Sequence, residues 1–502
     1  MTVHGTITAP LSRHARTTPD RIALVCDGHS ITWAELDEAV DRLAAHLAKA
    51  VPAGHGIALH LPNGPALALL FLAACRAGRE AQILDPSWPA ETVQLAITTL
   101  LPGIVISGGI GPGGELGTLK AIDPQSPFAT VADAVGASPS LVAVPEPDPL
   151  TPFYVGFTSG STGAPKGYRR HHLSWIESFR AADREFDIGA GDVILAPGAL
   201  THSLFLYGLA HGLHVGATVI LCRQFRPNVA NRLIASHKAT VVYGVPTQLE
   251  MMIEAAAREG EPPFATTRWI LSSGAKWQGR ATAQLHRQFP LARFAEFYGA
   301  SELSFITVAK NDENVPADSV GRAFAGVDLT IRDHLGRCLP PGEVGQVFVA
   351  SPFLFMEYAC GSTAAIMRYG EAVSVGDIGL LDARGFLHLV GRANRMIITA
   401  GKNVHPEEIE HVLEAHPAVT AAAVLGVTDH RRGERLMALL KLRPHASVSS
   451  SDMVGYARAR LPLYKIPRRF ALTPEWPTTS SGKTDFDALR RIWEAGACET
   501  LP

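Results

Sequence analysis

Short apolar runs alternate with segments of helical periodicity along most of this chain. The run Gln248–Arg258 repeats its apolar positions with the spacing of a helix. Runs of four or five residues on either side of it read as buried strands: Val193–Ala196, Thr218–Leu221, Thr240–Tyr243, Arg268–Leu271 and Phe294–Tyr298. Alternation of this kind predicts an α/β fold of layered, mostly parallel sheets flanked by helices.

Two helices near the N-terminus are predicted on further grounds. Thr32 and Glu35 have the spacing of a capping box, and the apolar positions from Leu36 to Leu47 share one helical face. The run Ala66–Cys75 is wholly apolar but too short to span a bilayer. We expect it to be a buried helix.

The pattern changes after about Gly391. Strands at 420–427 and 436–442, with helices at 407–415 and 452–461, predict a separate α+β unit of roughly a hundred residues, an ordinary size for a domain. We therefore expect a large N-terminal domain over residues 1–391, a hinge at 392–395 and a small, mobile C-terminal domain over 396–502.

Composition narrows the class of protein. With 502 residues, 47% of them hydrophobic and 18% charged, the chain is globular and large enough for two domains. A formal net charge of -2 gives no electrostatic reason to expect nucleic acid or an anionic membrane as a partner. The six cysteines are scattered without a C-x-x-C pair, and no secretion signal is evident. We expect a cytoplasmic protein without structural zinc or disulfides.

The strongest chemical signal is a loop rich in glycine, serine and threonine. After the apolar residues from Tyr154 the chain reads T-S-G-S-T-G-A-P-K-G, and backbone N–H groups, four hydroxyls and a lysine can there converge on one anion. It is not a Walker A loop, because Lys166 lies between Pro165 and Gly167. We interpret the loop as a polyphosphate site rather than a flexible surface segment. Its binding residues would be Thr158, Ser159, Gly160, Ser161, Thr162, Gly163 and Lys166.

Two other patterns carry less information. Glycines at 109, 111 and 114 satisfy G-x-G-x-x-G, but no convincing helix follows, so a plain loop is expected. The adjacent histidines at 171 and 172 lack the spacing of a metal site and are expected to be packing or surface residues.

The loop resembles the phosphate-binding signature of the adenylate-forming superfamily. That superfamily includes acyl- and aryl-CoA synthetases, the adenylation domains of nonribosomal peptide synthesis and firefly-type luciferases. Residues 298–302 read Y-G-A-S-E and resemble its Y-G-x-T-E motif, with serine for threonine. The resemblance implies that Tyr298 stacks on adenine, that Ser301 bonds a phosphate oxygen and that Glu302 helps to hold Mg²⁺. Nucleotide contacts are also implied for Gly299 and, with lower specificity, for Ser273, Gly274 and Ala275.

Further motifs follow in the superfamily's order. Asp377, in S-V-G-D-I-G, resembles the aspartate that accepts hydrogen bonds from the ribose hydroxyls. Residues 391–410 resemble the hinge motif, in which Arg392 would contact the nucleotide and Asn394 would be the pivot between domains. Relatives usually have Asp, sometimes Lys, at the pivot, and positions 395 and 398 also differ. The way in which charge would bias the two domain orientations is therefore open.

The C-terminal motifs complete the resemblance. Residues 477–483 resemble P-x-T-x-x-G-K, which makes Lys483 the expected catalytic lysine, bridging the attacking carboxylate and the α-phosphate. Gly401 falls on the glycine that lines the pantetheine path, and Lys402 follows it in that channel.

The sequence signals for the carboxylic acid pocket are less specific than those for the nucleotide site. His202 lies where acyl- and aryl-CoA ligases often have a histidine, and it is our candidate gate between the acid pocket and the thiol channel; the alternative is a packed histidine near a strand end. No Asp occurs between Pro197 and Gly212, which weighs against an α-amino acid. The expected lining of an apolar pocket is His202, Phe205, Tyr207, Gly244 and Ala300.

The resemblance implies an acid–thiol ligase that uses ATP, Mg²⁺ and coenzyme A. A carboxylic acid would be activated as acyl-adenylate with release of pyrophosphate, then transferred to CoA with release of AMP. Two alternatives stay open: a stand-alone enzyme that loads the phosphopantetheine of an acyl carrier protein, and a catalytically silent nucleotide-binding relative.

Overall fold

The computed structural model describes most of the chain, in two compact units. The residues described are 5–107, 116–118, 128, 131–134, 144–158, 166–274, 282–361, 366–399, 402–429, 433–473, 475–478 and 484–501. The first unit comprises residues 1–160, 164–329 and 349–363, and the second comprises residues 161–163, 330–348 and 364–502.

The first unit contains two large sheets. In the order in which the described strands pair, the first sheet consists of β15 (Arg322–Ala323), β14 (Ser304–Lys310), β13 (Arg293–Ala300), β12 (Trp269–Ser272), β11 (Val241–Gly244), β9 (Val193–Ala196), β10 (Thr218–Leu221), β1 (Ile22–Cys26) and β2 (His29–Thr32). The second sheet consists of β18 (Glu357–Cys360), β8 (Lys166–His171), β7 (Pro152–Thr158), β4 (Glu80–Ile83), β3 (Gly56–His60), β5 (Ile104–Ser107) and β6 (Leu116–Thr118). Central pairs such as β11–β12 and β3–β4 are parallel, whereas β13–β14 and β7–β8 are antiparallel hairpins.

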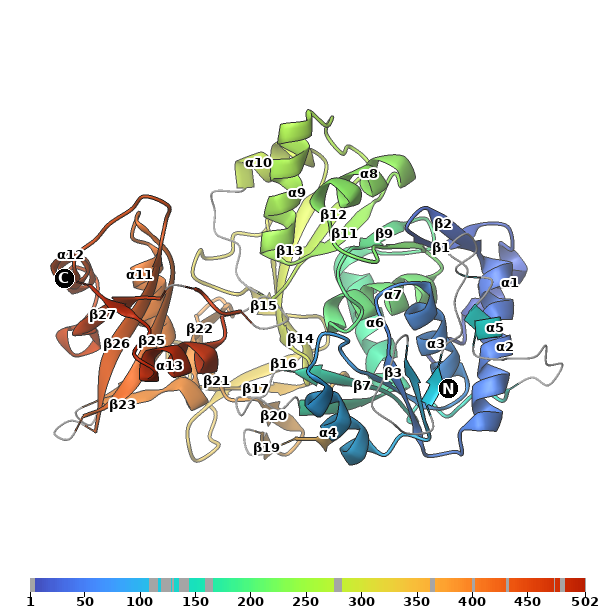
Figure 1. Ribbon diagram of the computed structural model, residues 1–502, viewed down its shortest axis with the longest axis horizontal. Coiled ribbons are helices and arrows are strands. Elements are labelled where there is room, and N and C mark those ends of the chain that lie inside the picture. Colours follow the sequence, from blue (N-terminus) through green and yellow to red (C-terminus); the bar gives the residue numbers. More distant parts are fainter. Residues whose placement is uncertain are drawn as a thin grey trace. The chain divides into compact units, whose positions relative to one another are not determined.

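Helices cover these sheets on both faces. They are α1 (Leu11–Thr17), α2 (Trp33–Ala50), α3 (Pro65–Arg76), α4 (Ala90–Leu100), α5 (Val131–Ala134), α6 (His172–Phe186), α7 (Ser203–Val215), α8 (Pro227–His237), α9 (Pro246–Glu259) and α10 (Thr282–Gln288). Helices α8, α9 and α10 lie together on one side of β11–β13, and α6 and α7 lie on the other (Figure 1). This layering is what the alternating pattern predicts.

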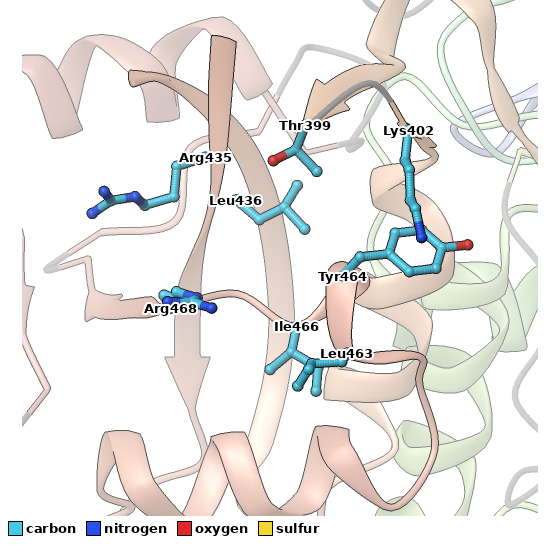
Figure 2. A pocket seen from close by; sticks show the side chains of 8 residues that line it. All are labelled: Thr399, Lys402, Arg435, Leu436, Leu463, Tyr464, Ile466 and Arg468. Atoms are coloured by element: carbon cyan, nitrogen blue, oxygen red, sulfur yellow. The ribbon is translucent and has the colours of Figure 1, made fainter. Parts of the chain in front are cut away.

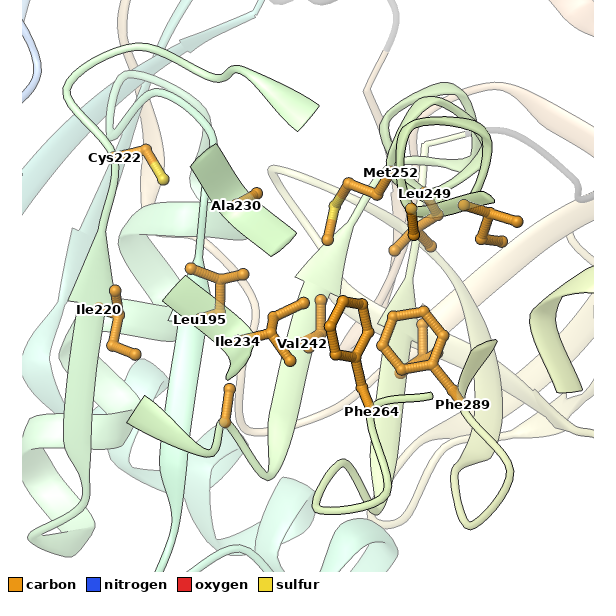
Figure 3. Packing of buried hydrophobic residues seen from close by; sticks show 14 of the residues in the cluster. Leu195, Ile220, Cys222, Ala230, Ile234, Val242, Leu249, Met252, Phe264 and Phe289 are labelled. Carbon is orange, nitrogen blue, oxygen red and sulfur yellow. The ribbon is translucent and has the colours of Figure 1, made fainter. Parts of the chain in front are cut away.

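A compact apolar core joins α8 and α9 to the first sheet. Ile234 of α8 and Leu249 and Met252 of α9 pack against strand residues that include Leu195 and Val242 (Figure 3). These five side chains are almost completely buried, and full burial of each stabilises the fold by about 1.5–3 kcal/mol. The core therefore fixes the strands whose ends carry the motifs.

An aromatic cluster lies on the opposite face. Trp175 and Phe179 of α6 contact Tyr207 of α7, and Tyr207 in turn meets Phe305 of β14 edge to face at 5.1 Å. Trp175 also contacts Phe153 of β7, so the cluster connects the two sheets through α6 and α7.

The second unit contains two smaller sheets. One comprises β16 (Asp328–Arg332), β17 (Gly345–Ala350), β19 (Met367–Tyr369), β20 (Ala372–Ser374), β21 (Asp377–Leu381) and β22 (Leu387–Arg392). The other comprises β23 (Ile397–Thr399), β24 (Lys402–Val404), β25 (Val419–Asp429), β26 (Gly433–Leu442), β27 (Arg469–Leu472) and β28 (Glu499–Thr500). The accompanying helices are α11 (Pro406–Glu414), α12 (Ser450–Arg458) and α13 (Phe486–Glu494), with short 3-10 turns η1 (Ala393–Arg395) and η2 (Leu463–Lys465).

The predicted elements agree with the structure within a few residues at each end. Strands β9 and β10 have the predicted bounds, and the capping box of Thr32 and Glu35 is formed at the start of α2. The apolar run Ala66–Cys75 is the buried helix α3. The predicted hinge at 392–395 lies inside the second unit, where α11 contacts β22, so the hinge itself stays a prediction.

Candidate active site

The two ends of the Gly/Ser/Thr loop are held together by a hairpin. Thr158, the last residue of β7, pairs with Lys166, the first residue of β8. Between them, the predicted ligands Ser159, Gly160, Ser161, Thr162 and Gly163 lie outside the described residues. The hairpin fixes where the loop leaves and re-enters the sheet.

Predicted site residues at the ends of β11, β12 and β13 lie at one edge of the first sheet. In the parallel register Gly244 pairs with Ser272, and Ser272 with Glu296, so β11, β12 and β13 end on the same side. Ser273 and Gly274 follow β12, and Gly274 has a φ of +97°, a conformation that glycine adopts without strain. Ala275 lies outside the described residues. Ligand sites of open α/β sheets occur at this edge.

The Y-G-A-S-E motif forms the end of β13 and the tight turn into β14. Tyr298 is partly exposed, and the pairing register shifts between Tyr298 and Gly299. A Cβ on Gly299 would lie 2.2 Å from the carbonyl oxygen of Ser304, so only glycine fits. The turn places Ser301 at intermediate exposure and buries Glu302, which is 7% exposed.

Tyr358 links Glu302 to the lysine of the loop. Its hydroxyl donates a hydrogen bond of 2.7 Å to Oε1 of Glu302. The ammonium of Lys166 lies 5.7 Å from the centroid of the same ring. Strand β18, which carries Tyr358, pairs with β8, which begins at Lys166, and this pairing brings the three side chains together.

Arg170 supports the same turn from the interior. Its guanidinium donates hydrogen bonds to the carbonyl oxygens of Phe353 (2.5 Å) and Ser301 (2.6 Å). It is 2% exposed, and this burial lowers the pKa of Arg170. Sequence reasoning missed both Arg170 and Tyr358. The alternation along β8 could have indicated Arg170, because it lies two residues from the buried Tyr168 and so shares its face.

The predicted ribose ligand Asp377 and the predicted nucleotide contact Arg392 lie together in the second unit. Asp377 begins β21 and pairs with Arg392 at the end of β22, whose Nε donates to Oδ1 of Asp377 at 2.9 Å. Asp377 is buried and Arg392 is exposed. The N–H of Gly376 donates to the hydroxyl of Ser374, which fixes the turn before Asp377.

The predicted hinge includes the short 3-10 turn η1. Asn394 lies in η1, between Arg392 and Arg395. Arg395 donates to Glu407 (3.0 Å) and Glu410 (2.6 Å) of α11. Its guanidinium carbon lies 3.5 Å from the centroid of Phe486, at the start of α13.

Gly401 and Lys483 lie outside the described residues. Thr478 and Thr484, which precede and follow the segment that contains Lys483, form an antiparallel bridge. Lys402 is the first residue of β24.

The predicted acid-binding residues lie around α7 and the strand ends. His202 occupies the N-cap position of α7, and its carbonyl oxygen accepts from the N–H of Phe205. The ring of Phe205 covers Gly198, where a Cβ would lie 2.0 Å from it. Tyr207 belongs to the aromatic cluster, and burial raises its pKa. Gly244 and Ala300 end β11 and β13.

A cavity of about 310 Å³ lies beside Lys402 in the second unit (Figure 2). The ammonium of Lys402 lies 4.3 Å from the ring centroid of Tyr464. The lining residues combine three cations with apolar side chains: Thr399, Lys402, Arg435, Leu436, Leu463, Tyr464, Ile466 and Arg468.

The described residues contain neither a candidate membrane span nor a cluster of potential metal ligands. No helix there is long and apolar enough to cross a membrane. No group of three or more His, Cys, Asp and Glu side chains in the same residues is placed to hold a metal ion.

Comparison with known proteins places this arrangement in a family. Residues 11–359 match the family model of AMP-binding enzymes, and residues 408–483 match that of the AMP-binding enzyme C-terminal domain. An uncharacterized acyl-CoA ligase of Bacillus subtilis, YhfT, is 36% identical over 97% of this chain and 98% of its own. A fatty acid–[acyl-carrier-protein] ligase of Streptomyces coeruleorubidus, ScoC, is 30% identical over 97% of this chain and 96% of its own.

The fold agrees with that assignment. The structure of o-succinylbenzoate-CoA synthetase from Bacillus subtilis, solved with an acyl-adenylate intermediate, superimposes with a TM-score of 0.84 at 25% identity, and covers 98% of this chain and 99% of the other. The chain therefore belongs to the AMP-binding enzyme family and is an acyl-CoA synthetase of the adenylate-forming superfamily.

Proposed function

We propose that this enzyme activates a carboxylic acid with Mg-ATP and transfers the acyl group to coenzyme A. In the first step a carboxylate oxygen attacks the α-phosphorus, the bond to the β-phosphate breaks and pyrophosphate leaves. In the second step the thiol sulfur of CoA attacks the acyl carbon, the thiol proton passes to solvent, and AMP leaves with the electron pair of the broken mixed anhydride bond. Neither step needs a covalent enzyme nucleophile, because positioning and preorganised charge lower both barriers.

The observation that carries the proposal is the placement of Lys166 and Glu302 around Tyr358. Tyr358 contacts both Lys166, a cation suited to phosphate oxygens, and Glu302, a carboxylate suited to a metal. Mg²⁺ is usually bound through one or two carboxylates plus substrate phosphates, and Glu302 fits this use because Tyr358 engages one of its oxygens by a hydrogen bond. When bound there, the metal would neutralise charge on the phosphates.

The remaining nucleotide contacts follow the motifs. Tyr298 would stack on adenine, Ser301 would bond a phosphate oxygen, and Asp377 would accept from the ribose hydroxyls beside Arg392. Lys483 would stabilise the charge that builds during adenylation. His202 would gate the thiol channel, and Gly401 would line the pantetheine path after the C-terminal domain has rotated about Asn394.

The cavity beside Lys402 supports free CoA as the acceptor. The cations Lys402, Arg435 and Arg468 line it, and CoA carries a pyrophosphate and a further phosphate that such cations bind. Tyr464 is 38% exposed and offers a ring face for a base. The likeness to ScoC favours an acyl carrier protein as the second candidate acceptor. With all six cysteines present as free thiols, we propose a cytoplasmic location.

The test is a panel of carboxylic acids with Mg-ATP, with and without CoA, analysed by mass spectrometry for acyl-AMP and acyl-CoA. Acyl-CoA from free CoA is the expected result. Acyl-AMP that persists in the presence of CoA but disappears with a phosphopantetheinylated carrier protein would support the second acceptor. Absence of acyl-AMP with every acid, together with measurable ATP binding, would contradict the proposal and favour a silent relative.

A further inference from the structure

Glu302 is held by a residue outside the five-residue motif to which it belongs. Tyr358 reaches it from β18, and the hydrogen bond joins the phenol to one carboxylate oxygen, Oε1. The backbone of the same segment adds a second tie, because the N–H of Phe355 donates to the carbonyl oxygen of Glu302 at 2.8 Å. The ring of Phe355 packs edge to face against Tyr358 at 5.2 Å. The tyrosine is therefore itself held in place.

This geometry restricts what the carboxylate can do. A glutamate has two oxygens, and fixing one of them sets the direction of the other. Ligating carboxylates in metal sites are commonly oriented in this way by a hydrogen-bonding partner. Since Glu302 is almost fully buried, a change of its rotamer would also require the surrounding turn to repack.

Tyr358 also affects the opposite charge nearby. The ammonium of Lys166 lies over its ring, which is a favourable position for a cation. Gly361, with a φ of +90°, allows the chain to pass close to the Lys166 side chain, where a Cβ would lie 3.0 Å from Cγ. The lysine and the glutamate thus each have Tyr358 as a partner.

We propose that Tyr358 is a positioning residue that presents Glu302 to the magnesium of Mg-ATP. The inference rests on the proposed function, in which Glu302 binds the metal. It assigns to the phenol hydroxyl the orientation of the carboxylate.

Tyr358→Phe tests the hydroxyl alone, because the ring and its packing remain. The Mg²⁺ concentration for half-maximal pyrophosphate release should rise about 10–100-fold, the usual effect of losing such a partner. The maximal rate should return at saturating Mg²⁺. Binding of Mn²⁺ in the presence of ATP, followed by electron paramagnetic resonance, should weaken by the same factor. Thioester formation from synthetic acyl-adenylate needs no magnesium–triphosphate complex and should be unchanged.

Two further variants sharpen the test. Tyr456→Phe removes a phenol hydroxyl from α12 in the second unit and should leave the Mg²⁺ dependence unaltered. In a Glu302→Gln background, Tyr358→Phe should have little further effect on Mn²⁺ binding, because the group it positions is already lost.

The inference would be overturned by an unchanged Mg²⁺ requirement in Tyr358→Phe. It would equally be overturned by a lower rate at every Mg²⁺ concentration with unaltered Mn²⁺ affinity, since Tyr358 would then act on something other than the metal. Failure of the wild-type enzyme to form any adenylate would contradict the proposed function, while the Mn²⁺ measurement with ATP would still decide the role of Tyr358.

Discussion

Gly299→Ala should disable the first half-reaction while the chain still folds. The added Cβ would lie 2.2 Å from the carbonyl oxygen of Ser304, and contacts below 3.0 Å essentially do not occur, so the backbone must move by about 0.8 Å. The atom it meets is backbone, which cannot rotate away. The displaced turn carries Ser301 and Glu302. A misplacement of about 1 Å in a catalytic constellation costs about 10²-fold in rate.

We therefore expect kcat/KM for pyrophosphate release to fall about 100-fold, which is about 2.7 kcal/mol in the barrier. Crowding of this kind costs about 1–3 kcal/mol of stability, so the rate should be measured well below the Tm of the variant. Gly189→Ala is the matched control, because a Cβ there meets nothing within 4 Å and the backbone has no positive φ. A Gly299→Ala enzyme that kept a third or more of the wild-type rate would refute the argument that this glycine sets the position of the turn.

Two further substitutions test separate parts of the proposed function, and a third tests the stability of the fold. Lys483→Ala should abolish adenylate formation yet leave thioester formation from synthetic acyl-adenylate largely intact; an equal loss of both, measured by mass spectrometry, would contradict its role. Asp377→Ala should weaken ATP binding about 10–100-fold, as expected for hydrogen bonds to a charged group, but should barely affect binding of 2′,3′-dideoxy-ATP in calorimetry. Tyr243→Phe should raise the free energy of unfolding by about 1 kcal/mol, since its hydroxyl is buried with no hydrogen-bond partner among the described residues; a lower stability in denaturant titration would show that the hydroxyl is satisfied.

The elements could be predicted because their signals are local. Runs of apolar residues fixed β9 and β10 to the residue, and the side-chain pattern of Thr32 and Glu35 marked the start of α2. Strands β11 and β12 were each predicted one residue early, since Gly244 and Ser272 carry no apolar side chain to extend the run although their backbones still pair. Parallel pairing then brings the predicted site residues to one edge, where ligand sites of open α/β sheets occur.

The supporting side chains could not be predicted in the same way. Tyr358 meets Glu302 only because β18 pairs with β8 at the edge of the second sheet, and no short-range pattern encodes that pairing between distant segments. Arg169 and Arg170 are adjacent in the sequence. Arg169 is exposed enough to pair with Glu357, whereas Arg170 is buried against carbonyl oxygens. The composition of a segment does not distinguish the two, whereas the face of the strand does.

Arg395, at the predicted hinge, has charged and aromatic partners within the second unit. Together with Asn394, Arg395 departs from the superfamily pattern, and these two departures are the only sequence features that support a catalytically silent relative. Arg395 introduces a positive charge. That charge is matched, because Glu407 and Glu410 of α11 accept its hydrogen bonds and Phe486 covers its guanidinium. Burial raises the pKa of Glu410, and the adjacent guanidinium opposes that shift. The two carboxylates and the aromatic ring thus accommodate the guanidinium of Arg395 within the second unit. The departure at Arg395 is therefore weak support for lost activity.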